Sequence, residues 1–133
     1  AAIIFFSSGL AHAHEYEGSS FVMSHPFAYP SQAGQTLLPV YLRFLSLTGP
    51  DKLIGVECRY ADTAEFRSNQ NLQADAIPFI AISPEQSFDI NNPDTPHILL
   101  KGIRLPFENM RYYDMKLIFE KSGAIDLTVA VGI

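Results

Sequence analysis

The stretch "YYDMKLIFEKSGAIDLTVAV", residues 112–131, decides the fold class, because it contains two strand-like runs on either side of one turn. The runs are 112–120 and 124–131, and the sequence Lys-Ser-Gly separates them. In the second run apolar residues stand two apart, so they share one face of a strand: Ile125, Leu127, Val129 and Val131. The stretch therefore predicts a β-hairpin with one buried face.

The rest of the chain shows strand signals of the same kind. Segments 37–48 and 52–60 read as strands joined by the turn Gly49-Pro50-Asp51, which predicts a second hairpin. Shorter strand-like runs lie at 19–25, 63–67, 77–82, 86–90 and 97–103. No segment keeps a helical period over three turns. This pattern predicts an all-β domain, an antiparallel β-sandwich or a Greek-key barrel.

Composition and motifs exclude several classes of function. The chain has 133 residues, 47% of them hydrophobic, and a formal net charge of −5 without a basic stripe, so nucleic acid is not expected as a partner. The single cysteine, Cys58, permits no intrachain disulfide and reads as a buried small apolar residue. We find no G-x-S-x-G elbow, no spaced catalytic triad and no glycine-rich phosphate loop, so an enzyme is not predicted.

The N-terminus reads as the end of a signal peptide. Residues 1–13 begin with an apolar run and finish with Ala11-His12-Ala13, which fits the A-x-A pattern of a cleavage site. We therefore expect residues 1–13 to be a residual signal-peptide tail, cleaved after Ala13, and residues 14–133 to be the mature domain; the alternative is an apolar N-terminal strand or an interface helix. The apolar run is too short to span a membrane. These features predict an exported, periplasmic protein without a membrane span after cleavage.

Four segments in order resemble the PCuAC-type periplasmic copper chaperones. They are "SHPFAYPSQAGQTLLPVYLRF" (24–44), "AEFR" (64–67), "PHILLKGIRLPF" (96–107) and "LIFEKSGAIDLTVAV" (117–131). The resemblance covers nearly all of residues 14–133. It implies a cupredoxin-like (Greek-key) antiparallel β-sandwich that binds Cu(I) through His and Met side chains. It also implies delivery of copper toward the CuA centre of cytochrome oxidase, with the oxidase copper-site subunit or another copper carrier as partner.

The ligand set that the resemblance implies is incomplete in this sequence. The family has an upstream His with nearby Met residues, followed by a downstream His-x-Met pair. Arg67 stands at the position of the upstream His, the loop 68–75 contains no Met, and Leu99 replaces the Met of the pair. His97 remains, either as a ligand or as a polar residue at the start of a strand. Because arginine has no lone pair to offer and leucine has no sulfur, we expect the family's usual site not to form.

Other soft donors offer alternative copper sites. Met23 and His25 stand two apart, so a strand would present both on one face; the alternative is that Met23 packs in the core and His25 caps the proline turn. His14 would be the mature N-terminal residue and would offer its amino and ring nitrogens to Cu(II); the alternative is a frayed terminus. The candidate metal ligands are therefore His97, His25, Met23 and His14.

A second interpretation keeps the fold and removes the metal. The protein would then be a periplasmic protein-interaction module that binds partners through exposed strand edges and the loop around Phe107. Copper titration distinguishes the two interpretations, and the placement of His25 relative to His97 tests whether these two residues share one site.

Overall fold

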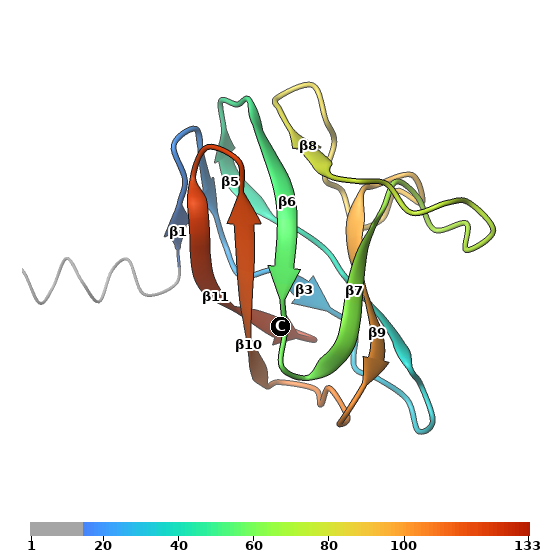
Figure 1. Ribbon diagram of the computed structural model, residues 1–133. Helices are drawn as coiled ribbons and strands as arrows, with labels where there is room; N and C mark the ends of the chain where they lie inside the picture. Colours follow the sequence, from blue (N-terminus) through green and yellow to red (C-terminus); the bar gives the residue numbers. More distant parts are fainter. Residues whose placement is uncertain (1–14) are drawn as a thin grey trace, which may run out of the picture.

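Three β-sheets build the structure, a computed structural model that describes residues 15–133 (Figure 1). These residues form eleven strands and no helix, so the predicted all-β fold class is confirmed. The described part of the chain accordingly contains no helix with the length and apolar character needed to cross a membrane.

The sheets contain three, five and three strands. The first has the order β1-β2-β5, with bounds Tyr16–Glu17, Phe21–Met23 and Phe44–Leu47. The second has the order β3-β11-β10-β6-β8, with bounds Phe27–Ala28, Gly123–Val131, Tyr112–Phe119, Asp51–Glu57 and Ile80–Ile82. The third has the order β4-β9-β7, with bounds Leu37–Val40, His97–Ile103 and Ala61–Arg67. All pairs are antiparallel except β3 with β11, which is parallel.

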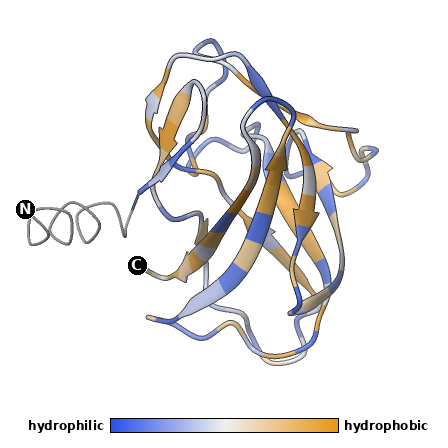
Figure 2. Cartoon of the chain, turned by 60° about the vertical axis from the view of Figure 1, so that its left-hand side comes forward, coloured by the Kyte–Doolittle hydropathy of each residue, from blue (hydrophilic) through white to orange (hydrophobic). Residues whose placement is uncertain are grey.

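The predicted C-terminal hairpin is confirmed as β10 and β11, which pair from Tyr112 opposite Ala130 to Phe119 opposite Gly123. The side chains of β10 that face inward are Tyr113, Met115, Leu117 and Phe119, all at most 8% exposed. They alternate with exposed or half-buried residues, as a strand with one buried face requires. Figure 2 shows apolar colour running along the strands, interrupted by hydrophilic residues. This hairpin therefore contributes a large part of the core.

The prediction that residues 37–48 form one strand is wrong. The predicted hairpin between this segment and residues 52–60 is also wrong. The segment forms two strands in different sheets, since β4 pairs with β9 whereas β5 pairs with β2. Val40, Tyr41 and Leu42 are all buried, so the side chains do not alternate where the chain crosses between sheets. An apolar run on both faces is the pattern of such a crossing as well as of a central strand. The following strand, β6, pairs with β10 and β8 instead.

The segment between β7 and β9 contains less strand than expected. The predicted strand 77–82 shortens to β8, and the predicted strand 86–90 is absent from the structure. Turns replace it: the backbone N–H of Gln86 donates to the carbonyl of Ser83, and Asp89 Oδ1 accepts the N–H of Asn91 at 2.9 Å. Asp and Asn side chains compete with strand pairing in this way. Local hydrogen bonds therefore form turns here, although the short apolar pattern predicted a strand.

Candidate metal centre

His97 is buried at the first residue of β9, with 2% of its surface exposed. Its Nδ1 lies 3.1 Å from the carbonyl oxygen of Thr95, and its ring centre lies 5.3 Å from that of Tyr41. A carbonyl only accepts, so Nδ1 carries the proton and Nε2 keeps a lone pair. Burial lowers the pKa of His97, the Thr95 hydrogen bond raises it, and the positive charge of Arg67 lowers it, with a net lowering. The ring is therefore neutral at pH 7, the form that binds metals.

Arg67 lies directly across the sheet from His97, as its partner in the β7–β9 register. Its guanidinium is buried and makes three short contacts. It donates to Glu65 Oε2 at 2.8 Å and to the carbonyls of Asn71 and Ala74 at 2.9 and 2.6 Å. Arg67 thereby holds segment 68–75 against the sheet. Arginine cannot act as a metal ligand. The side chain at the expected upstream ligand position therefore places a permanent positive charge there instead.

Three positions of the expected site, 67, 97 and 99, lie on one face of the sheet together with Glu65. Glu65 is the register partner of Leu99, next to the Arg67–His97 pair. The residues between them, Phe66 on β7 and Ile98 on β9, belong to the main apolar cluster. His97 and Leu99 therefore face the opposite side, and both are at most 4% exposed. This face therefore carries four different groups: the neutral imidazole of His97, the guanidinium of Arg67, the carboxylate of Glu65 and the aliphatic side chain of Leu99.

Glu65 is paired with two cations beside this face. Glu65 accepts hydrogen bonds from Lys101, at 2.9 Å, and from Arg67, and these contacts lower its pKa. Because both cations already neutralise Glu65, this carboxylate is not a free ligand for copper. Within residues 15–133 no group of three or more His, Cys, Asp and Glu side chains is arranged to hold a metal ion. The sequence expectation that the family's usual site does not form stays a prediction.

His25 lies in a different environment from His97. Its Nδ1 is 3.1 Å from Tyr16 Oη and 3.0 Å from Thr128 Oγ1, and its ring packs beside that of Tyr112. These partners belong to β1, β11 and β10, whereas those of His97 lie next to β9 and β4. The structure therefore gives the two histidines separate sets of neighbours.

Met23 and His14 complete the predicted ligands. Met23 is 0% exposed and belongs to the main apolar cluster. Strand β2 ends at Met23, so the two-residue strand period that was expected to place His25 beside it does not extend to His25. This prediction of a shared strand face is wrong, because the chain leaves the strand at that point. His14 lies outside the described residues.

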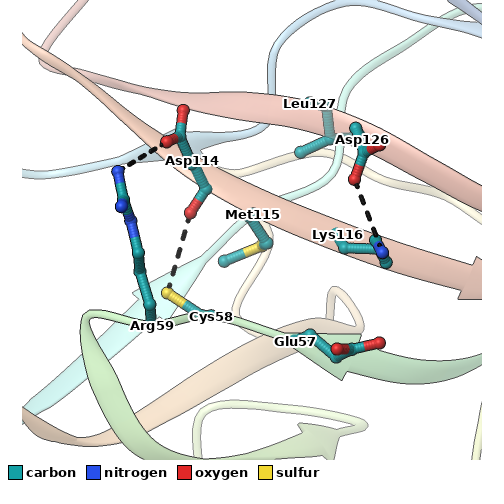
Figure 3. A pocket seen from close by; sticks show the side chains of 8 residues that line it. All are labelled: Glu57, Cys58, Arg59, Asp114, Met115, Lys116, Asp126 and Leu127. Atoms are coloured by element: carbon teal, nitrogen blue, oxygen red, sulfur yellow. Dashed lines mark hydrogen bonds and ion pairs between the residues drawn. The ribbon is translucent and has the colours of Figure 1, made fainter.

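A second group of soft atoms lies in a hollow of about 670 Å³ beside β6 and β10 (Figure 3). Cys58 and Met115 both line it, and the Cys58 thiol donates to the carbonyl of Asp114 at 3.9 Å. Burial raises the pKa of Cys58, which keeps the thiol protonated and a poor ligand. Four of the charged side chains around the hollow form ion pairs, Arg59 with Asp114 and Lys116 with Asp126, whereas Glu57 forms none within residues 15–133. No ligand for copper is therefore assigned in this hollow.

Two residues have roles that the sequence did not reveal. Phe107, expected in an exposed loop that binds partners, is 0% exposed, and its ring centre lies 4.3 Å from that of Tyr113. That part of the interaction hypothesis is wrong, because the aromatic side chain fills the core. Asp51, expected only in a turn, is buried and accepts four hydrogen bonds. The paired charges of Glu65 and Arg67 were not predicted either, although their Glu-x-Arg spacing places both on one strand face.

Comparison with known proteins gives structural matches only. No protein-family model and no curated protein matches this sequence. Among solved structures, the chain is similar to the apo PCuAC domain from PmoF1, with a TM-score of 0.73 and 22% identity over 89% of this chain and 98% of that one. It is also similar to the copper-bound PCuAC domain from PmoF2, with a TM-score of 0.71 and 26% identity over 89% and 97%.

A third structure extends the likeness to another source. The Cu(I) form of DR1885 from Deinococcus radiodurans matches with a TM-score of 0.62 and 17% identity, over 94% of this chain and 85% of that one. The matches span nearly the whole length of both PmoF PCuAC domains. The chain therefore has the PCuAC-type fold, a cupredoxin-like β-sandwich.

Proposed function

We propose that the protein is a copper-chaperone-like carrier that handles Cu(I) through an altered site and passes it toward CuA assembly. The observation that supports this most is His97. It is a buried, neutral imidazole with an available Nε2, in a fold that a copper-bound PCuAC domain shares. Imidazole suits Cu(I), and a site with few protein ligands lets the ion leave for a partner. The role proposed is transport of an ion, so no catalytic residue is assigned.

Export to the periplasm is part of the proposal. It rests on the sequence Ala11-His12-Ala13 and the apolar run before it. Cleavage after Ala13 would make His14 the first residue, with an amino and an imidazole nitrogen close together. Such a pair favours Cu(II), so His14 is a second and separable candidate ligand. N-terminal sequencing of the secreted protein checks the cleavage site.

Titration with Cu(I) tests the proposal. We expect one equivalent to bind in competition with a chelator, and His97→Ala to weaken binding about tenfold or more, or about 1.4 kcal/mol. The matched control is His25→Ala, which removes an imidazole with other neighbours and should leave Cu(I) affinity unchanged. Acetylation of the mature N-terminus should abolish Cu(II) binding alone. Equal Cu(I) affinity of the wild type and His97→Ala would contradict the assignment of His97.

A metal-free interaction module is the second candidate, and the Arg67 guanidinium favours it. A fixed positive charge beside His97 repels a copper ion, and its contacts with Glu65, Asn71 and Ala74 need no metal. In this case neither copper ion binds the wild type with micromolar affinity. Absence of binding in the same titration therefore selects the second candidate.

A further inference from the structure

All charged residues of the segment between β7 and β9 are acidic. Residues 68–96, the acidic segment, contain Asp75, Glu85, Asp89 and Asp94 and no lysine, arginine or histidine, so their formal charge is −4 within a chain of −5. All four carboxylates are exposed, and none forms an ion pair within residues 15–133. Figure 1 shows this segment, in yellow-green to light orange, gathered around the start of β9. The segment itself therefore carries four exposed negative charges that no ion pair offsets within residues 15–133.

An apolar pocket of about 370 Å³ opens within this acidic segment. Its lining is mostly apolar and includes Ile77, Pro78, Phe79 and Pro96, while Asp94 is its one charged lining residue. Pro78 is exposed, and Ile77 and Phe79 are half-buried, so the pocket is accessible from solvent. The Nζ of Lys52 lies 4.6 Å from the centre of the Phe79 ring, which shows that the ring accepts a cation on one face. The pocket has room for one apolar side chain.

The pocket also adjoins the candidate metal centre. Two of its lining residues are sequence neighbours of that centre: Pro96 immediately precedes His97, and Ser68 immediately follows Arg67. The negative charge extends well beyond the pocket itself, over loops on both sides of β8, so recognition of charge here requires a ligand larger than the pocket. An anionic membrane or a nucleic acid would be repelled by this face. A basic protein surface would be attracted to it.

We propose that the pocket is a docking site for a protein partner that inserts one apolar side chain and places lysine or arginine residues over the acidic segment. Apolar anchors surrounded by complementary charge are typical of protein interfaces, where the anchor gives affinity and the charges give orientation and rate. The position beside His97 deepens the proposed function, because the partner is then the protein that exchanges copper. That link rests on the proposed function, whereas the docking itself does not require metal.

The test uses the metal-free protein and a capped tetrapeptide, Lys-Leu-Phe-Lys, followed by NMR. We expect the amide resonances of residues 77, 79–81, 94 and 95 to shift, with a dissociation constant of about 1 mM or tighter, and binding to weaken as salt is added. The peptide Glu-Leu-Phe-Glu should bind about tenfold more weakly because its charges are repelled. Lys-Ala-Ala-Lys should lose binding because it has no anchor.

Variants of the pocket and a distant control complete the test. Phe79→Ala and Asp94→Asn should each weaken Lys-Leu-Phe-Lys binding about threefold to tenfold. Both side chains are at least partly exposed, so the variants should fold. Glu17→Gln removes an exposed carboxylate on β1 and should leave the affinity unchanged. Equal binding of the acidic peptide, or resonance shifts confined to other strands, would overturn the docking site. Because no copper is present, that result is separate from failure of the copper titration.

Discussion

The double substitution Arg67→His and Leu99→Met should give the protein a Cu(I) affinity about 100-fold tighter than that of the wild type, or about 2.7 kcal/mol. The two changes remove a cation from the site and add one imidazole and one thioether. Both added groups are soft or borderline donors that suit Cu(I). With His97 they restore the upstream His and the downstream His-x-Met pair that the resemblance to PCuAC chaperones implies.

The geometry that supports this gain is already present in the backbone. Position 67 is the register partner of His97, and position 99 lies two residues further along the same face of β9. Leucine and methionine have similar volumes, so the buried site of Leu99 should accept the change at low cost. Loss of the Arg67 hydrogen bonds to Asn71 and Ala74 should loosen segment 68–75, which copper would then order again.

Matched variants separate ligand chemistry from loosening of the loop. The pair Arg67→Gln with Leu99→Ile removes the same cation and the same leucine but adds no strong ligand, so its Cu(I) affinity should rise only through the loss of repulsion, far less than that of the His/Met pair. Leu99→Met alone should give an intermediate gain, because the guanidinium is still present. X-ray absorption of the copper-loaded double variant should show nitrogen and sulfur ligands. If the Gln/Ile pair gains as much affinity as the His/Met pair, the effect is due to loss of charge and the assignment of the ligand positions is wrong.

The alternation of apolar and polar residues in the sequence predicted those strands that have one buried and one solvent-facing side. The hairpin of β10 and β11 has the expected position, because alternation in β10 separates a core face from an exposed or half-buried face. Strand β9 also has the expected bounds, although its first four residues are buried on both faces. Pairing between segments far apart in sequence was not predictable in this way. The turn at Gly49 was expected to join two paired strands, yet β5 and β6 belong to different sheets. An apolar run on both faces does not tell a continuous strand from one that crosses between sheets.

At the candidate site, residue types were predictable and their contacts were not. The shared face of Arg67, His97 and Leu99 follows from the strand period once β7 and β9 are known to pair. The stabilisation of the guanidinium by the carbonyls of Asn71 and Ala74 depends on the path of an irregular segment. No side-chain pattern encodes such backbone acceptors. The burial of Phe107 likewise depends on Tyr60 and Tyr113, which come from two other parts of the chain.

Asp51, at the start of β6, is hydrogen-bonded to the turn between β10 and β11. Its carboxylate accepts the Ser122 hydroxyl at 2.6 Å and the backbone N–H groups of Lys52, Lys121 and Ser122 at 2.7, 2.8 and 3.1 Å. The residue is only 3% exposed. Burial raises the pKa of this carboxyl, but the four hydrogen bonds to the charged form outweigh burial, and the net pKa lies below its ordinary value of 3.8.

We expect Asp51→Ala to lower the free energy of unfolding by about 3 kcal/mol at pH 7, because it leaves buried N–H donors of the turn without an acceptor. Urea denaturation followed by fluorescence or circular dichroism measures this loss. The control Asp126→Ala removes a carboxylate that is 86% exposed and 3.9 Å from Lys116, and it should change stability by less than about 0.5 kcal/mol. Similar losses in the two variants would mean that the Asp51 hydrogen bonds do not hold the turn.

The loss should depend on pH, with a sign fixed by the lowered pKa of Asp51. A carboxyl whose pKa is lower in the folded state binds protons more readily in the unfolded state, so its stabilisation is fully present well above pH 3.8. It disappears as pH falls below this value and through the lower pKa of the folded state. The difference between the wild type and Asp51→Ala should therefore be constant near neutral pH and shrink below about pH 4. A difference that stays constant down to pH 2 would show that the charged form of Asp51 has no stabilising role, and that the variant is weakened by the cavity it leaves.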